Sequence, residues 1–128
     1  MSSPTQDRRY GAVGNTAFKA PCTVATTVGT SSITLSGEQT INGVAVVTGD
    51  RVLVKNQTDA TENGIYVVDT SSWTRAIDFN GNYDVTRGTL VYVTQGSSVG
   101  KGLWTVSSTA PITIGTDDVN FTSVLLTT

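Results

Sequence analysis

Short runs of β-branched and aromatic residues recur at roughly ten-residue intervals along this chain, with turn-forming residues between them. No window carries apolar residues at the i, i+3, i+4, i+7 spacing of an amphipathic helix, and only residues 58–62 suggest a short helical turn. The predicted strands cover residues 33–35, 41–47, 51–55, 65–69, 73–76, 90–94, 103–106, 112–114 and 121–126, and the turn dipeptide Asn42-Gly43 lies within 41–47. This pattern predicts an all-β fold, either an antiparallel β-sandwich or a barrel.

The beginning of the chain differs from the remainder. Residues 1–20 contain glycines and a pair of arginines but no periodic pattern, whereas residues 21–128 hold all the predicted strands. We therefore expect an extended N-terminal docking arm, residues 1–20, followed by a single β-domain, residues 21–128. Arg8 and Arg9 could pair with acidic groups of a neighbour, and Tyr10 and Phe18 are large enough to anchor the arm. A frayed terminus is the alternative for this segment.

The composition argues against several classes of function. Charged residues make up 14% of the 128 residues and the net charge is −2, so no strong field attracts nucleic acid, and we expect no nucleic-acid partner. No apolar run approaches the roughly 20 residues of a membrane span, so we expect no membrane partner. The chain has no histidine, which removes Ser-His-Asp and Cys-His catalysis and the usual zinc sites. We therefore predict no enzyme activity and no cofactor.

The single cysteine, Cys22, allows no disulfide within the chain. It stands among alanine, proline, valine and threonine, and no histidine is available to activate it. We expect Cys22 to be a small buried hydrophobic residue, because a reactive thiol needs a nearby cation and Lys19 is the only close candidate in the sequence.

A polar segment near the middle of the chain places oxygen-bearing side chains at alternate positions, as calcium-binding loops do. The four positions are Asp78, Asn80, Asn82 and Asp84. The match to an EF-hand then fails, because Tyr83 stands where the loop requires glycine and Thr89 stands where it requires a bidentate glutamate. These residues are a weak calcium candidate, and a polar loop with Asx-turns is the better interpretation. We expect no bound metal.

Two tryptophans separate a structural protein from a sugar-binding one. Trp73 and Trp104 lie on or beside predicted strands, which favours packing in the core, whereas a carbohydrate-binding module would expose them on a flat face. Arg75 stands close to Trp73 in the sequence and is expected either to stack on it or to pair with Asp78.

The segment 49–68 predicts a β-hairpin with a long polar tip. Val52, Leu53 and Val54 form a short apolar run, residues 56–63 are polar, and residues 65–68 are β-branched and aromatic. Long polar loops between firm strands are common places for partner contacts. The candidate partner-binding residues of this tip are Asn56, Gln57, Thr58 and Asp59. The loop 78–84 is a second candidate for the same reason.

Several segments together resemble a β-strand module of tailed-bacteriophage virion proteins of the tail fibre and tail appendage type. They are GDRVLVKNQT at 49–58, NGIYVV at 63–68, WTR at 73–75 and GTLVYV at 88–93, with further anchors at 24–27, 33–37 and 112–115. The resemblance implies a structural component of the virion, a tail fibre, appendage or adaptor protein acting in assembly or host attachment. It implies other virion proteins as partners and a homo-oligomer, a trimer in a fibre. The alternatives are a capsid decoration (cement) protein and a carbohydrate-binding module.

Overall fold

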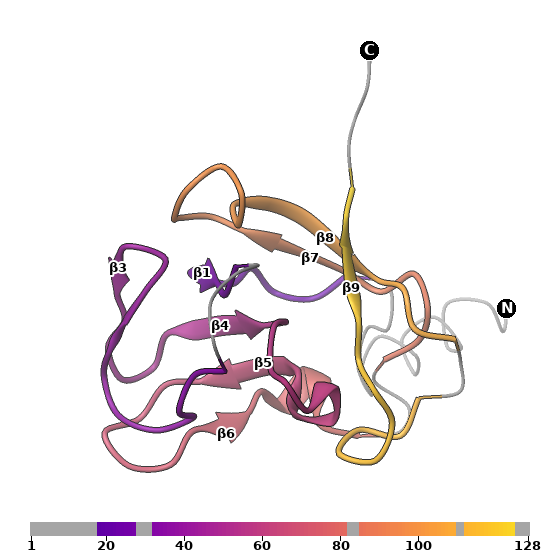
Figure 1. Ribbon diagram of the computed structural model, residues 1–128, viewed down its shortest axis with the longest axis horizontal. Helices are drawn as coiled ribbons and strands as arrows, with labels where there is room; N and C mark the ends of the chain where they lie inside the picture. The colour runs from indigo at the N-terminus through magenta and orange to yellow at the C-terminus, as the bar shows by residue number, and fades with distance from the viewer. Residues whose placement is uncertain (1–17, 28–31, 82–84, 110–111, 125–128) are drawn as a thin grey trace, which may run out of the picture.

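The computed structural model describes residues 18–27, 32–81, 85–109 and 112–124, and this part of the chain has an all-β fold (Figure 1). Its strands are β1 (Val24–Ala25), β2 (Thr40–Ile41), β3 (Val44–Ala45), β4 (Arg51–Val54), β5 (Gly64–Val67), β6 (Thr74–Arg75), β7 (Leu90–Val93), β8 (Gly102–Val106) and β9 (Phe121–Ser123). Two short 3-10 helices, η1 (Ala60–Glu62) and η2 (Ile77–Phe79), interrupt them. No helix in this described part has the length and apolar character needed to cross a membrane.

The first sheet has the strand order β1-β4-β5-β6. Strands β4 and β5 form the predicted antiparallel hairpin, with Leu53 opposite Ile65, and β6 continues the antiparallel pattern beside β5. Strand β1 instead runs parallel to β4, with Val24 opposite Val52, so the antiparallel prediction is wrong for this strand. Parallel neighbours need a long connection, and residues 26–50 supply one that also contains the small β2–β3 hairpin.

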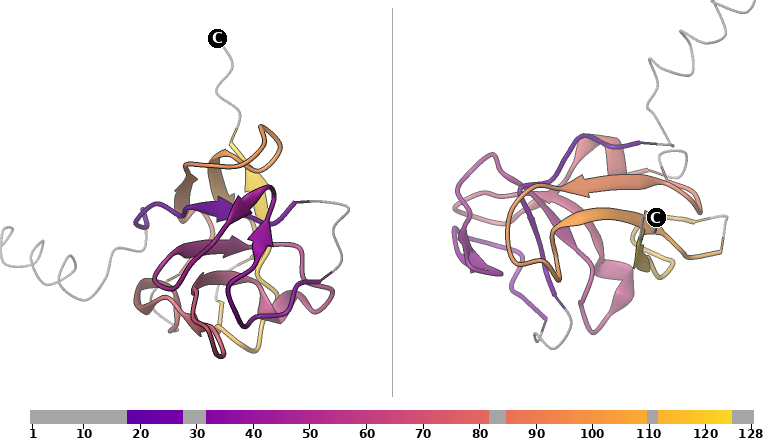
Figure 2. Two further views of the ribbon diagram at one scale, coloured as in Figure 1. Left: turned by 90° about the vertical axis from the view of Figure 1, so that its left-hand side faces the viewer. Right: turned by 90° about the horizontal axis from the view of Figure 1, so that it is seen from above.

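The second sheet is antiparallel and has the order β7-β8-β9. Residues 18–26 connect it to the first sheet, since they form hydrogen bonds in both directions. The backbone N–H groups of Lys19 and Cys22 donate to Leu90 and Tyr92 of β7, at 2.8 and 2.9 Å. Those of Thr23 and Thr26 donate to Arg51 and Leu53 of β4, at 2.7 and 3.0 Å. Figure 1 and the left-hand view of Figure 2 show this indigo segment between the two sheets.

Two apolar cores lie on opposite faces of the first sheet. Leu53, Ile65 and Ala25 belong to the first core, which they share with Val91 and other residues of the second sheet. The alternate residues of the same strands pack with Ile41, Val46 and Trp73 into the second core. Strands β4 and β5 are therefore buried on both faces, which explains why their sequences read as continuous apolar runs rather than as an alternation.

Two of the predicted strands are absent from the described structure. Residues 33–35 form no strand, because the backbone N–H and C=O of Ile33 bond to the side chain of Gln57 instead of a neighbouring strand. Residues 112–114 also form no strand, although Ile112 is buried in the first core. The helical turn expected at 58–62 is confirmed as η1, whereas the sequence pattern did not indicate η2.

Candidate functional site

The loop that follows β4 is held by its own polar side chains. Gln57 is only 8% exposed, and its amide group clamps Ile33: the Ile33 N–H donates to Oε1 at 2.9 Å, and Nε2 donates to the Ile33 carbonyl at 3.1 Å. Nε2 also donates to Glu62 at 3.1 Å. Gln57, predicted as a partner contact, thus makes its contacts inside the fold.

Asn63 ties the end of this loop to the segment before β9. Its Oδ1 accepts from the backbone N–H of Gln57 at 3.0 Å, and its Nδ2 donates to the carbonyl of Val119 at 2.9 Å. Asn63 is 2% exposed, so both bonds satisfy groups that would be costly to bury alone. Sequence reasoning treated this residue only as part of a turn.

Arg75 of β6 also bonds the backbone of this loop. It donates to the carbonyls of Asn63 and Thr61 at 3.0 and 2.8 Å, and its guanidinium lies 5.0 Å from the centre of the Tyr66 ring. The expected pairing of Arg75 with Asp78, or its stacking on Trp73, is therefore wrong. A side chain at Gly64 would meet the Arg75 guanidinium at 2.7 Å, and Gly64 has a φ of 153°, so this position requires glycine.

The exposed part of the tip is smaller than the sequence suggested. Thr58 and Asp59 are exposed, and Asp59 caps η1 by accepting from the N–H and hydroxyl of Thr61. These bonds, led by the one from the Thr61 hydroxyl, lower the pKa of the Asp59 carboxyl. Asn56 is engaged by Thr26 and Lys55, which donate to its Oδ1 at 3.0 and 3.2 Å. Of the four predicted contact residues, Thr58 and Asp59 are the two that face solvent.

Asp78, the first residue of the calcium candidate, forms an ion pair with Arg51. Both oxygens accept from the guanidinium, at 3.0 and 3.1 Å, and Arg51 also donates to the carbonyl of Ala20 at 3.0 Å. Asn80 is exposed, whereas Asn82 and Asp84 lie outside the described residues. In the described ranges no three His, Cys, Asp or Glu side chains gather in a way that could hold a metal ion.

Cys22 lies beside this ion pair and is 1% exposed, which confirms that it is a buried hydrophobic residue. Burial raises the pKa of the Cys22 thiol to about 12, although the positive charge of Arg51 opposes the rise. The thiol is therefore protonated and shielded at neutral pH, the opposite of what a reactive cysteine requires.

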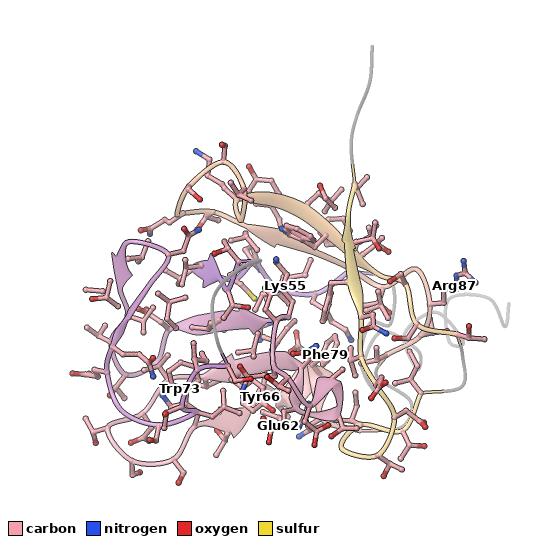
Figure 3. All side chains as sticks on the ribbon, in the orientation of Figure 1. Lys55, Glu62, Tyr66, Trp73, Phe79 and Arg87 are labelled. Carbon is pink, nitrogen blue, oxygen red and sulfur yellow. The ribbon has the colours of Figure 1, made fainter. Side chains whose placement is uncertain are left out.

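The tryptophans do not form an exposed platform; Trp73 is labelled in Figure 3. Trp73 is 6% exposed in the second core, and its Nε1 donates to the carbonyl of Gly37, which confirms the prediction of core packing. Trp104 packs partly against the first core, and the ammonium of Lys55 lies 4.1 Å from its ring centre. Partial burial lowers the pKa of this Lys55 ammonium.

The candidate site is instead the outer face of the second sheet. Val91 and Val93 point into the core, so the alternate residues of β7, Leu90 and Tyr92, point away from it. The register places Leu103 opposite Tyr92 on that side of the sheet. We define the outer face as the partly or fully exposed apolar residues Phe18, Leu90, Tyr92, Leu103 and Val124. Phe18 is 49% and Tyr92 44% exposed, and none of the five is charged.

Sequence reasoning found only one member of this face. Phe18 was assigned to the arm, and it forms a parallel bridge with Leu90. The alternation of residues 90–93 could have indicated Leu90 and Tyr92, if the core side of that strand had been known. The arm residues Arg8, Arg9 and Tyr10 lie outside the described residues.

No protein-family model, curated protein or solved structure matches this chain.

Proposed function

We propose that this chain is a structural component of a tailed-phage virion, present in several copies as a tail fibre, tail appendage or adaptor protein that acts in assembly or host attachment. The observation that carries the proposal is the outer face, whose apolar residues share one side of the second sheet with Thr105 and Thr122 and begin where the N-terminal segment joins the domain. Contiguous exposed apolar surface commonly marks contact sites between proteins.

The contacts among the resembling segments add support. The NQT segment clamps residue 33 of the ITLSG segment through Gln57, the WTR segment bonds the NG turn through Arg75, and Trp73 bonds Gly37. The resemblance to phage tail modules therefore covers residues that depend on one another, rather than scattered matches. These contacts hold together the loops around the first sheet, as expected of a shared structural module.

The other functional classes find less support among the described residues. Carboxylates that a hydrolase would need take structural roles: Asp78 pairs with Arg51, Asp59 caps η1, and Glu38 accepts two bonds from Thr48. A carbohydrate-binding module usually presents flat aromatic rings, but Trp73 is buried and Trp104 is covered by Lys55. A capsid decoration protein is the second candidate function, because such a protein would use the same kind of apolar contact face.

A purified phage particle tests the proposal. Its protein inventory is expected to contain this chain in several copies, and labelled antibody is expected to mark the tail rather than the shell. Labelling spread evenly over the shell would assign the chain to capsid decoration instead. Absence of the chain from the particle would overturn both assignments.

We further propose that the two sheets are parts of one incomplete barrel, with residues 18–26 as the shared strand and the preceding residues as a docking arm. Support comes from the hydrogen bonds of this segment to β7 on one side and β4 on the other. The contact between Val119 and Ala60, at 3.0 Å, brings the segment before β9 back to the first sheet. An experimental structure in which the two sheets separate at residues 18–26 would contradict this architecture.

A further inference from the structure

On the edge of β9 that faces away from β8, some backbone groups have no hydrogen-bond partner among the described residues. The N–H of Val124 donates to Leu103, and the N–H of Ser107 donates to Asn120, so residues 120, 122 and 124 direct their backbone groups toward β8. In an antiparallel pair the intervening residues direct theirs the opposite way. Phe121 and Ser123 therefore present N–H and C=O groups on the far edge, and no described residue bonds to them.

Exposed strand edges are usually protected by very short strands, charged side chains, proline or bulges. Of these features, the edge of β9 has only the short length, three residues. Residues 119–128 contain neither a charged side chain nor a proline. The strand is also regular, since Trp104, Thr105 and Val106 pair in sequence with Ser123, Thr122 and Phe121. The edge is short, but nothing in its side chains opposes an approaching strand.

The pattern of free groups is complementary to itself. If a twofold axis passes beside Thr122, Phe121 of one copy faces Ser123 of the other, and the reverse pair forms at the same time. Each is a pair that exchanges both backbone bonds, so all the outward groups of β9 find partners. A parallel approach or a threefold arrangement does not satisfy the same groups in this way. The chemistry of the edge thus points to a second copy of this chain.

We propose that β9 pairs antiparallel with β9 of a second copy. The β7-β8-β9 sheets of the two copies then form one continuous sheet around a twofold axis at Thr122. The outer faces of the two copies then lie on the same side of that sheet. Thr122 is exposed and lies on this side, opposite Thr105, so the two Thr122 side chains become direct neighbours. The dimer does not depend on the proposed virion role, and its test leaves that role open.

Charge at position 122 tests the axis directly, in the full-length chain. Thr122→Lys and Thr122→Glu each place like charges next to each other across the twofold axis, which destabilises strand pairs. Sedimentation should show a dimer for the unmodified chain and a monomer for each variant alone, with the neutral Thr122→Val as the control that remains dimeric. An equimolar mixture of the lysine and glutamate variants should recover the dimer, because every mixed pair brings opposite charges together.

A second pair of variants tests the hydrogen bonds. Ser123→Pro removes an N–H that makes no bond within the described fold, whereas Ser123→Ala keeps it. The proline variant should lose dimerisation and keep the far-UV spectrum and unfolding midpoint of the alanine control. A monomeric unmodified chain at all concentrations, a trimer, or a dimer that survives Thr122→Lys and Ser123→Pro would each overturn the proposal.

Discussion

The two sheets of this protein differ in how much of their surface the fold uses. The first sheet is covered on both sides, with Leu53 and Ile65 in one core and Val52 and Val54 in the other. Among the described residues, the second sheet is covered on one side only, and its other side is the outer face. Burial of apolar surface is the main favourable term in folding, so the first sheet contributes more stability per strand than the second.

Polar side chains link distant segments around the first sheet, and Asn63 and Asn42 also bond segments beside the second sheet. Gln57, Asn63 and Arg75 bond the loops and strands around the first sheet to one another through side-chain to backbone bonds. In the second sheet Trp104 bonds the carbonyl of Gly100, within its own hairpin. A first sheet that is fixed by two cores and a polar network can hold a second sheet whose outer face and β9 edge are left exposed by the described residues.

The same substitution in each sheet tests this difference most strongly. Leu53→Ala removes a fully buried side chain from the core between the sheets, and we expect it to lower the free energy of unfolding by about 2–5 kcal/mol. Leu103→Ala on the outer face should cost less than about 1 kcal/mol, because that side chain is already partly in water. Urea-induced unfolding, followed by tryptophan fluorescence, measures both.

Leu53 and Leu103 are matched in chemistry, so their difference isolates burial from residue type. Equal losses for the two variants would mean that the outer face is covered in solution. Measurement across a range of protein concentrations then distinguishes coverage by a second copy from coverage within one chain.

The next largest effect is expected at the clamp. Gln57→Ala leaves the N–H and C=O of Ile33 without their partners, and we expect a loss of about 1–3 kcal/mol in the free energy of unfolding. Thr58→Ala is the neighbouring control, because Thr58 is exposed and its backbone bond to Ser32 remains. Similar small losses for both variants would show that the loop is not a structural clamp.

Much of the fold could be predicted from the sequence because it rests on local patterns. The hairpin of β4 and β5 follows from two apolar runs around a polar loop, and the β2–β3 hairpin follows from Asn42-Gly43, whose φ angles are 48° and 80°. The parallel pairing of β1 with β4 could not be predicted, because it depends on a long connection rather than on any local signal.

The candidate site was harder to predict than the fold. The polar residues of the tip looked available because sequence reasoning cannot tell a solvated amide from one that bonds a distant backbone, as Gln57 does with Ile33. Asp78 was only a weak calcium candidate in the sequence, and no local pattern predicted its ion pair with Arg51 of another strand. The outer face could not be predicted, because alternation along a strand does not show which side of the strand is buried.

Cys22 is a probe of the join between the sheets. Because burial raises its pKa from 9.0 to about 12, the folded chain keeps the thiol protonated, and the unfolded chain releases the proton first as the pH rises. This contribution to stability is therefore complete below pH 9.0 and is lost progressively toward about pH 12. A thiol reagent at pH 8 should modify Cys22 only through opening of the fold.

The rate of that reaction compares local with global opening. If the sheets are held as one unit, labelling at pH 8 should follow global unfolding, and urea should accelerate both equally. Labelling that is much faster than global unfolding, and insensitive to low urea, would show that the sheets part at residues 18–26.

The smallest expected change in stability comes from deletion of the arm. Two deletions with different end points test where the arm ends and the domain begins. We predict that deletion of residues 1–17 changes the free energy of unfolding by less than about 0.5 kcal/mol, because this segment carries no periodic apolar pattern of its own. Deletion of residues 1–20 also removes Lys19, whose N–H bonds Leu90, and Ala20, whose carbonyl accepts from Arg51, and should cost clearly more.

Incorporation into particles should respond differently from stability. If residues 1–17 dock on a neighbouring protein, the shorter deletion should reduce incorporation while leaving the unfolding midpoint nearly unchanged. The two readouts are measured on the same variant, by complementation of a phage that lacks the chain and by urea unfolding of the purified protein. Normal incorporation would contradict a docking arm. A large loss of stability would instead mean that these residues cover part of their own domain, with the outer face beside Phe18 as the nearest apolar surface.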